Sequence, residues 1–474
     1  MAAYRSAEKQ LHGPVAFRPV NKRRRSINFL AIMVWCLVSL SGLSLGPAEA
    51  RVGLIRDAEI EHSIRLFAAP LFAAADLDAE AVSVHLVNDV RLNAFVSGGQ
   101  RIYLNTGLIL AVDSAAEILG VLAHESGHIV GGHLSRTREA MESATTQNII
   151  AMVLGVGAMV VSKGDVGAAI VSGGGHAANR SLLKYSRTQE SLADQAAIRI
   201  LERAGYAPDG MLATLEKLRG QETLITSRQD PYVRSHPLTT DRITTMRAAV
   251  ERAKPGKDIS HFEYLLSRMK AKIYGYMEEP GRTYRRYPET DKSVAGRYGR
   301  AIALHRDART DEAVALLDGL IKEQPDDAWF HEQKGQFLYE RGRTAEAIPM
   351  LLRAAELAPS EFLILTLLGQ AMIASEKPEM IHDAIRHLRA AAHLEPRLPG
   401  IWRHLAIAYG RDGQLPRSFL ASAEFSILTG RPEDARHFAR KAVRGLPVGS
   451  PDHLRAQDIQ HSATRVISKQ RKKQ

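Results

Sequence analysis

The chain has 474 residues, of which 45% are hydrophobic and 24% are charged. This length predicts two or three domains with hydrophobic cores of their own, and this composition is that of an ordinary water-soluble protein. The formal net charge of +11 is a mild surplus. Such a surplus is usually spread over a solvated surface, so the composition argues against a nucleic-acid-binding protein.

The first 50 residues have the three parts of a secretory signal peptide. A basic run, Lys22–Arg25, precedes an apolar stretch from Ile27 to Leu45, and Pro47–Ala50 then supplies an A-x-A cleavage pattern. We therefore predict cleavage after Ala50 and export to the periplasm. An uncleaved segment that anchors the protein in the inner membrane is the alternative.

Cleavage would also remove the only cysteine, Cys36. The mature chain would then have neither a disulfide bond nor a lipidation site, and its core and any bound metal would hold it together. Its net charge would be +6, because residues 1–50 carry seven Lys or Arg and two Asp or Glu.

Residues 55–80 have the hydrophobic pattern of a helix, which Pro70 is expected to break or kink. Its core candidates recur at spacings of three and four residues: Ile60, Ile64, Phe67 and Leu71. The period then changes to that of β-strands, with Gly98-Gly99 as a turn. The strand candidates alternate or cluster: Val82, Val84, Leu86, Phe95, Ile102 and Leu104.

The next segment contains an HExxH motif, formed by His124, Glu125 and His128. Ser114–Glu117 reads as a capping box and an apolar run follows it directly, so the motif falls inside a helix. Residues four apart in a helix lie one turn above each other, and His124 and His128 can therefore bind one metal ion.

Zinc lowers the pKa of a bound water to about 7, and Glu125 is placed to take its proton and pass it to a leaving amine. Gly127, between the two ligands, leaves room for a close neighbour. Zinc proteases commonly bind a substrate peptide along a sheet edge, where main-chain hydrogen bonds give sequence-tolerant affinity. Arg101–Asn105 is the candidate edge strand, and a plain structural strand is the alternative.

Residues 149–175 form two apolar, glycine-punctuated halves, each too short to cross a bilayer. A buried helical hairpin, a mobile lid over the site and a membrane-surface contact through 149–172 are the three interpretations. The glycine-rich joints favour the lid, because glycine hinges permit opening.

Two histidines leave a third protein ligand to be found, and two patterns can supply it. In the HExxHxxGxxH pattern a third histidine follows the second by six residues, but that position is Leu134. His133 misses it by one residue, which rotates a helical side chain by about 100°, so His133 is a poor substitute. The alternative ligand is Glu190, in a helical segment with Asp194 one turn later. Asp194 would accept the other ring N–H of a ligand histidine and fix its tautomer.

Together these motifs resemble those of the HtpX-like and Ste24-like gluzincin peptidases. The match rests on His124–His128, on Glu190–Asp194 and on Ser235–Leu238 followed by Arg242, within about residues 55–250. The resemblance implies a zinc metalloendopeptidase with one zinc ion per chain.

With a signal peptide and helical repeats, the chain resembles a periplasmic branch of that family. The resemblance implies misassembled outer-membrane β-barrel proteins as clients and the β-barrel assembly machinery as docking partner. In that branch the histidine of the S-H-P segment can latch the zinc, and the following arginine serves catalysis, which implies these roles for His236 and Arg242. Chemically, His236 could be a fourth ligand that silences the zinc, and Arg242 could stabilise the oxyanion. A structural histidine before Pro237 is the alternative for His236.

Beyond about residue 293 the chain repeats with a period near 34 residues. Small residues and terminal prolines recur in these units, with Leu320 at one of the small-residue positions: Ala313, Leu320 and Pro325; Gly335, Ala347, Ala354 and Pro359; Ala384, Ala391 and Pro396; Ala435, Ala442 and Pro447. Small residues let paired helices approach, and the prolines end each second helix. This resembles the tetratricopeptide repeat and predicts an interaction surface without chemistry of its own.

The predicted fold is mainly α-helical with a small β-sheet: an α+β zincin peptidase domain followed by an α-solenoid. The predicted boundaries are 1–50 for the signal peptide, 51–255 for the peptidase domain, 256–292 for a helical connector, 293–450 for the repeats and 451–474 for a basic tail.

The leading hypothesis is an exported zinc endopeptidase that cleaves misfolded or misassembled envelope proteins. A chaperone-like scaffold that acts mainly through its repeats is the second hypothesis, and an inner-membrane quality-control protease is the third. Glu125 argues against a purely non-catalytic role, because a structural metal site needs no base.

Overall fold

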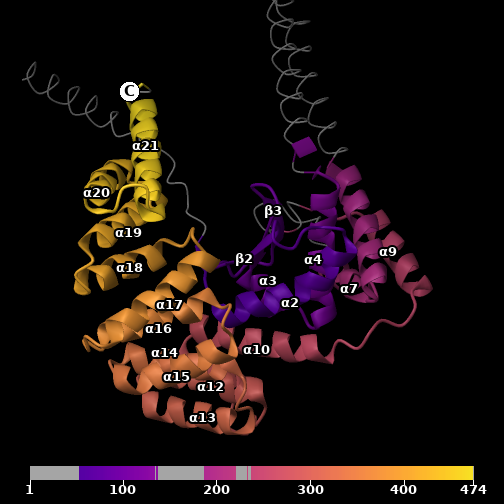
Figure 1. Ribbon diagram of the computed structural model, residues 1–474. Helices are drawn as coiled ribbons and strands as arrows, with labels where there is room; N and C mark the ends of the chain where they lie inside the picture. Colours follow the sequence, from indigo (N-terminus) through magenta and orange to yellow (C-terminus); the bar gives the residue numbers. More distant parts are fainter. Residues whose placement is uncertain (1–52, 134, 137–185, 220–231, 233–235, 473–474) are drawn as a thin grey trace, which may run out of the picture. The chain divides into compact units, whose positions relative to one another are not determined.

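The computed structural model describes residues 53–133, 135–136, 186–219, 232 and 236–472 (Figure 1). The predicted signal peptide at 1–50 and the segment 149–175 lie outside these residues. Among the helices within them, none combines the length and the apolar composition that crossing a membrane requires.

The N-terminal region, residues 53–252, contains the following described strands and helices: β1 (Leu54–Ile55), α2 (Ala58–Ala74), β2 (Ser83–Val87), β3 (Ala94–Ser97), β4 (Arg101–Asn105), α3 (Thr106–Ala111), α4 (Ala115–Val130), a helix at 186–204, α7 (Asp209–Lys217) and α9 (Thr240–Arg252). The helices that follow are α10 (Ser260–Met277), α11 (Pro280–Arg286), α12 (Val294–Arg306), α13 (Thr310–Glu323), α14 (Ala328–Glu340), α15 (Thr344–Leu357), α16 (Phe362–Ala374), α17 (Met380–Leu394), α18 (Pro399–Arg411), α19 (Leu415–Leu428), α20 (Pro432–Gly445) and α21 (Pro451–Arg471).

Helix α2 forms where the hydrophobic spacing predicts it. Asp57 caps its first turn, because the Ile60 N–H donates to Asp57 Oδ1 at 2.9 Å. The four predicted core side chains of this helix are all buried, at 3% exposure or less. Pro70 lies inside the helix, which continues to Ala74.

The small sheet has the strand order β1-β2-β4-β3. Strands β2 and β4 are parallel, whereas β3 and β4 are antiparallel and are joined through Gly98 and Gly99, both of which have positive φ. The prediction that Arg101–Asn105 is an edge strand is wrong. This segment is β4, and the hairpin partner β3 occupies one of its sides while β2 occupies the other. The edge strand nearest the HExxH helix is β3, which packs against α4.

Helix α4 carries the HExxH motif through the hydrophobic core of the N-terminal region. The N–H groups of Asp113 and Ser114 both donate to Glu117 Oε1, at 2.6 and 3.2 Å, so the predicted capping box fixes the start of the helix. The helix is buried at every position from Glu117 to Gly127. This burial holds the motif in a single orientation.

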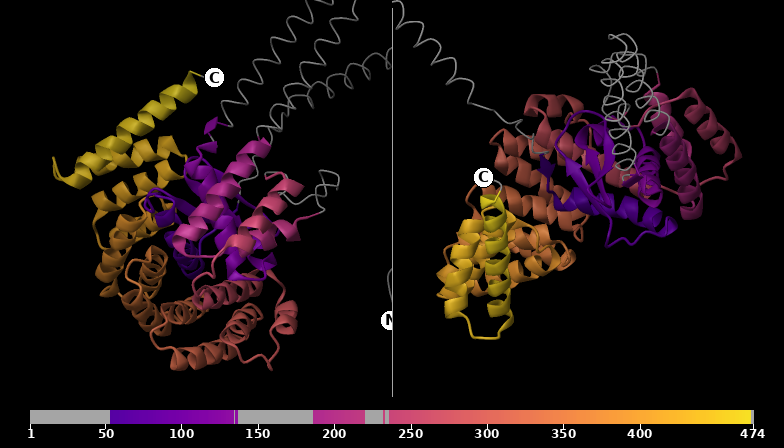
Figure 2. Two further views of the ribbon diagram at one scale, coloured as in Figure 1. Left: turned by 90° about the vertical axis from the view of Figure 1, so that its right-hand side faces the viewer. Right: turned by 90° about the horizontal axis from the view of Figure 1, so that it is seen from above.

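The predicted repeats are observed as consecutive helices that pack against each other from α12 to α20 (Figures 1 and 2). The predicted small residues lie at the helix contacts, as expected for tetratricopeptide-type pairs. Four alanines at the equivalent position are fully buried: Ala313, Ala347, Ala384 and Ala435. Residues 451–471 do not form a tail but the helix α21, whose Ala456, Ile459 and Ala463 pack against the preceding helices.

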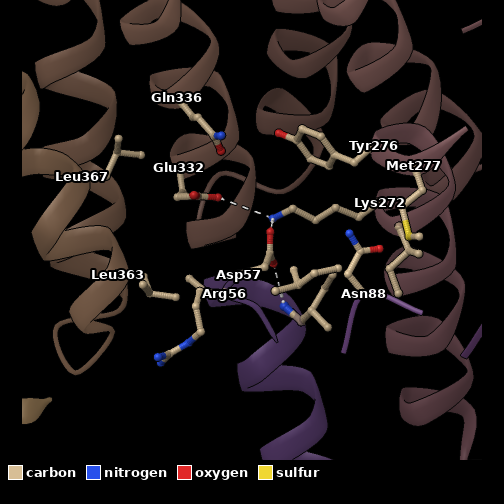
Figure 3. Close-up of a pocket in the computed structure, with 14 residues that line it drawn as sticks. Arg56, Asp57, Asn88, Lys272, Tyr276, Met277, Glu332, Gln336, Leu363 and Leu367 are labelled. Atoms are coloured by element: carbon tan, nitrogen blue, oxygen red, sulfur yellow. Dashed lines mark hydrogen bonds and ion pairs between the residues drawn. The ribbon is translucent and has the colours of Figure 1, made fainter. Parts of the chain in front are cut away.

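A buried ionic cluster links α2 to α10 and to the first repeats (Figure 3). Lys272 of α10 is fully buried, and its Nζ lies 2.9 Å from Asp57 Oδ2, 3.2 Å from Glu59 Oε2 and 3.7 Å from Glu332 Oε2. Arg268 Nη2 lies 2.7 Å from Glu59 Oε1. A cavity of about 440 Å³ opens beside Lys272 and Glu332. Buried ion pairs of this kind are costly to break from one side only.

Glu332 makes this cluster sensitive to pH. Burial raises the pKa of Glu332 from 4.5 to about 7 against the opposing effect of Lys272. Because the folded state holds this proton more tightly than the unfolded state, the free energy of unfolding falls as pH rises from about 4.5 to about 7. Glu332→Gln should remove that part of the pH dependence, on the order of 3 kcal/mol.

The measurement is denaturant unfolding of the wild type and Glu332→Gln across this pH range. Glu356→Gln, at an exposed position of α15, is the control. Identical pH profiles for the wild type and Glu332→Gln would refute the assignment.

Candidate metal centre

Four side chains from three segments converge on one point in the N-terminal region. His124 and His128 come from α4, Glu190 from the helix at 186–204, and His236 from the segment ahead of α9. One potential ligand atom from each lies within 4.8 Å of the others. His124 is fully buried, and Glu190 and His236 are 2% and 6% exposed.

Gly127 lets the helix that bears Glu190 approach α4. A Cβ atom at this position would lie 2.8 Å from the carbonyl oxygen of Ala193 and 3.1 Å from Ala196 Cβ. Any larger residue would therefore push the two helices apart and draw Glu190 away from the histidines. The close neighbour predicted for Gly127 is this helix.

The distances between the four groups match the edges of a tetrahedron. His124 Nε2 lies 3.1 Å from His128 Nε2, 3.3 Å from His236 Nδ1 and 3.3 Å from Glu190 Oε2. Glu190 also lies 3.4 Å from His128 Nε2 and 3.1 Å from His236 Nδ1. Four ligands at 2.0–2.1 Å from a tetrahedral zinc ion would be about 3.3 Å apart. The donor set and its spacing therefore fit a zinc ion.

Asp194 and Arg242 contact two of the four converging residues, His124 and Glu190. Asp194 Oδ1 lies 3.0 Å from His124 Nδ1, the ring nitrogen that faces away from the other ligands. Arg242 donates from Nε to Asp194 Oδ2 at 2.6 Å and from Nη2 to Asp194 Oδ1 at 2.8 Å. Its Nη1 lies 3.0 Å from Glu190 Oε2. One buried guanidinium thus holds both carboxylates in place.

The electrostatics of the site favour positive charge at its centre. Burial alone would lower the pKa of His124, but Asp194 and Glu190 outweigh burial and raise that pKa to about 9. Burial likewise works to raise the pKa of Glu190, yet His236 and His124 hold it well below its usual value. A divalent cation supplies the charge that this arrangement stabilises.

The side chain of Glu125 faces the same centre. The side chain is fully buried, and neither of its oxygens has a hydrogen-bond partner among the described residues. Burial raises the pKa of Glu125. A buried carboxylate that accepts no hydrogen bond is costly, and beside a metal ion such a group is able to take a proton from a bound water.

His236 occupies the site from the side of the sheet edge. Its Nδ1 points to Glu190 and His124, while its Nε2 lies 3.2 Å from the carbonyl oxygen of Ala94 in β3 and 3.5 Å from Glu125 Oε1. The ring of Tyr232 stacks on His236 with centroids 4.6 Å apart. The contacts to Ala94 and Tyr232 were not predicted: Ala94 is distant in the sequence, and the stacking of Tyr232, four residues before His236, depends on the local turn of the chain.

Comparison with known proteins agrees with this geometry. Residues 55–250 match the sequence profile of peptidase family M48. These residues are a peptidase family M48 domain. The chain therefore contains a metalloprotease domain of this family, and its C-terminal half consists of tetratricopeptide-like helical repeats.

Three curated relatives show how far the similarity extends. A protein named "Beta-barrel assembly-enhancing protease" from Yersinia pestis is 27% identical over 413 residues, which cover 86% of this chain and 84% of that relative. The protein of the same name from Escherichia coli K12 is 25% identical over 85% of this chain and 82% of its own length. "Metalloprotease YcaL" of Escherichia coli K12 is 30% identical over 36% of this chain and 62% of its own length. The first two extend through both the M48 domain and the repeats.

A solved structure entitled "MamA MSR-1 C2" is 22% identical, covers 37% of this chain and 99% of its own, and has a TM-score of 0.31.

Proposed function

We propose that this M48 metalloprotease is a zinc-dependent endopeptidase of the periplasm that hydrolyses misfolded or misassembled envelope proteins. The observation that carries the proposal is the tetrahedral spacing of His124, His128, Glu190 and His236 beside the carboxylate of Glu125, which accepts no hydrogen bond from the described residues. In this proposal His124, His128 and Glu190 hold the zinc permanently, and His236 occupies the fourth position until substrate displaces it. The signal-peptide pattern of residues 1–50 supports export, and relatives named for β-barrel assembly support a place in the envelope.

Glu125, Asp194 and Arg242 each have a separate role in the proposed hydrolysis. Zinc, when bound, supplies Lewis-acid polarisation and lowers the pKa of water. Glu125 takes a proton from the attacking water and delivers it to the nitrogen of the leaving amine, for which its raised pKa suits it. Asp194 fixes the His124 tautomer, and Arg242 holds Asp194 and Glu190. The contacts of Arg242 favour this supporting role over contact with an oxyanion.

The edge strand β3 is the proposed binding site for the substrate backbone. Ala94–Ser97 pairs only with β4 within the described sheet, and its Ala94 carbonyl lies beside His236. A peptide added to this edge would pair through main-chain hydrogen bonds and therefore with little dependence on its sequence. Such recognition suits unfolded or misassembled chains. Because His236 lies beside the Ala94 carbonyl, His236 would block both the metal centre and this edge strand.

The repeats are proposed to dock clients or a larger assembly. Two relatives that extend through this region are named for β-barrel assembly, which supports misassembled outer-membrane proteins as clients and the β-barrel assembly machinery as partner. A chaperone-like scaffold is the second candidate function. The position of His236 favours this function, because His236 would occupy the metal centre at rest and prevent cleavage there.

His236→Ala separates the two functions. If His236 is a latch, its removal should raise the rate of casein cleavage several-fold and leave zinc content near one ion per chain, because three ligands remain. His382→Ala, on an exposed part of α17, is the control and should change neither quantity. An unchanged or lower rate in His236→Ala would return His236 to a structural role and shift the weight to the scaffold.

A further inference from the structure

His133 lies immediately after the HExxH helix, at the position where the spacing rules it out as a ligand. It is 3% exposed, and its backbone carbonyl accepts a hydrogen bond from Gln189 Nε2 at 3.3 Å. A Cβ atom at Gly131 would lie 2.3 Å from His133 Nε2, so this glycine makes room for the ring. The fold therefore encloses the ring of His133 in a specific position, although His133 is not one of the four converging residues described above.

The ring of His133 contacts His128, a candidate metal ligand, at the ring nitrogen that points away from the metal centre. His128 directs Nε2 into the centre and Nδ1 outward, and His128 Nδ1 lies 3.0 Å from His133 Nδ1. The two rings are nearly perpendicular, at 81°, with centroids 5.0 Å apart. One of these nitrogens must carry a proton and the other must accept it.

The proposed metal centre settles which nitrogen donates. A histidine that offers its Nε2 lone pair to a cation carries its proton on Nδ1. His128 must then donate from Nδ1, and His133 Nδ1 must accept. The proton of a neutral His133 ring is thereby placed on Nε2, next to Gly131. The same logic applies to His124, whose outward nitrogen faces Asp194.

We infer that His133 is a positioning residue for the metal centre, which accepts the Nδ1 proton of His128 and so fixes the tautomer and orientation of that ligand. This inference rests on the proposed metal function of His124, His128 and Glu190. The two ligand histidines are thus supported differently, His124 by an anionic carboxylate and His128 by an imidazole. The bond between the Gln189 amide and the His133 carbonyl ties this support to the helix that carries Glu190.

The test compares three substitutions that differ in where they place an acceptor. In His133→Asn the amide oxygen can replace Nδ1, because both atoms are bonded to Cγ. In His133→Gln the oxygen lies one bond further out, and in His133→Leu there is no acceptor. Zinc dissociation constants of the full chain are measured by competition with a chromophoric chelator, and visible absorption of Co²⁺-loaded protein reports ligand geometry. Thermal unfolding checks that each variant is folded.

We expect His133→Leu and His133→Gln to weaken zinc binding by about 10–100-fold, the usual cost of losing such a partner. His133→Asn should stay close to the wild type in affinity and in its Co²⁺ spectrum. Equal affinity in all four proteins would overturn the inference, and so would equal losses in all three variants, which would assign His133 to packing alone. A wild-type protein that binds neither metal would instead overturn the proposed metal function, and the inference with it.

Discussion

Glu125→Gln should lower the rate of peptide-bond cleavage by roughly 10²–10⁴-fold, the range that a positioned general base contributes. The amide has nearly the same size as the carboxylate, but it cannot accept the proton of the attacking water. The carboxylate of Glu125 has no hydrogen-bond partner among the described residues, and its contact to His236 Nε2 is 3.5 Å long, so its replacement by a neutral group of the same shape should not break a structural hydrogen bond. Folding should therefore be unharmed, and burial of a neutral amide in place of a carboxylate could even stabilise the protein.

Zinc content and cleavage of a casein-type substrate are measured on the same preparation. Zinc should stay near one ion per chain, since Glu125 is not one of the four converging groups. Glu202→Gln, at an exposed position on the helix that carries Glu190, controls for loss of one negative charge. Cleavage at the wild-type rate in Glu125→Gln would remove Glu125 from the role of base.

The second large effect is expected from Glu190→Ala, which should lose the metal. Glu190 contacts His124, His128 and His236 and is the only carboxylate in the converging group. Without it the site loses both a ligand and the negative charge that offsets a divalent cation. Zinc affinity should fall by more than the roughly 100-fold that loss of an outer partner costs. Asp194→Asn, which removes only such an outer partner, should fall within about 10–100-fold.

Glu190→Ala should leave the surrounding hydrogen bonds of Arg242 to Asp194 intact. Arg242 keeps its pair of hydrogen bonds to Asp194 in Glu190→Ala, so the fold should survive well enough for metal analysis. Elemental analysis of zinc after dialysis is the measurement, with thermal unfolding as a check. Zinc near one ion per chain in Glu190→Ala would mean that Glu190 is not the third ligand.

Local features explain why much of the fold could be predicted from sequence. The spacing of apolar residues in α2, the capping box at Ser114 and the small residues of the repeats each act within one or two turns of helix. The HExxH motif and the Glu190–Asp194 spacing are also helical patterns. For this reason the sequence could place these side chains on one face before any tertiary contact was known.

Other features depend on partners that are distant in the sequence. Strand β4 was predicted to be an edge, but its pattern is the same whether one or both of its sides are paired. Helix α21 was predicted as a tail, because its basic character hides the few alanine and isoleucine side chains that pack. Sequence spacing correctly discouraged His133 as a ligand, yet it could not show that the ring supports His128 from outside.

His236 shows the same limit at the site itself. Its part in the centre was implied by family resemblance, whereas its contact to Ala94 arises only when β3 and the segment ahead of α9 are brought together. The contact to Ala94 and the contacts to His124 and Glu190 place His236 across both the edge strand and the metal centre, and this position is the basis of the proposed latch.

The central proposal is that zinc held by this site cleaves peptide bonds. The most direct measurement is the zinc content and the cleavage rate of one preparation of the chain, taken before chelation, after chelation and after zinc is restored. His236→Ala is measured in parallel to keep a latch from hiding activity. We expect about one zinc ion per chain, loss of cleavage with the metal and recovery when zinc returns. Cleavage that survives complete removal of zinc, or absence of cleavage in both fully loaded proteins, would contradict the proposal.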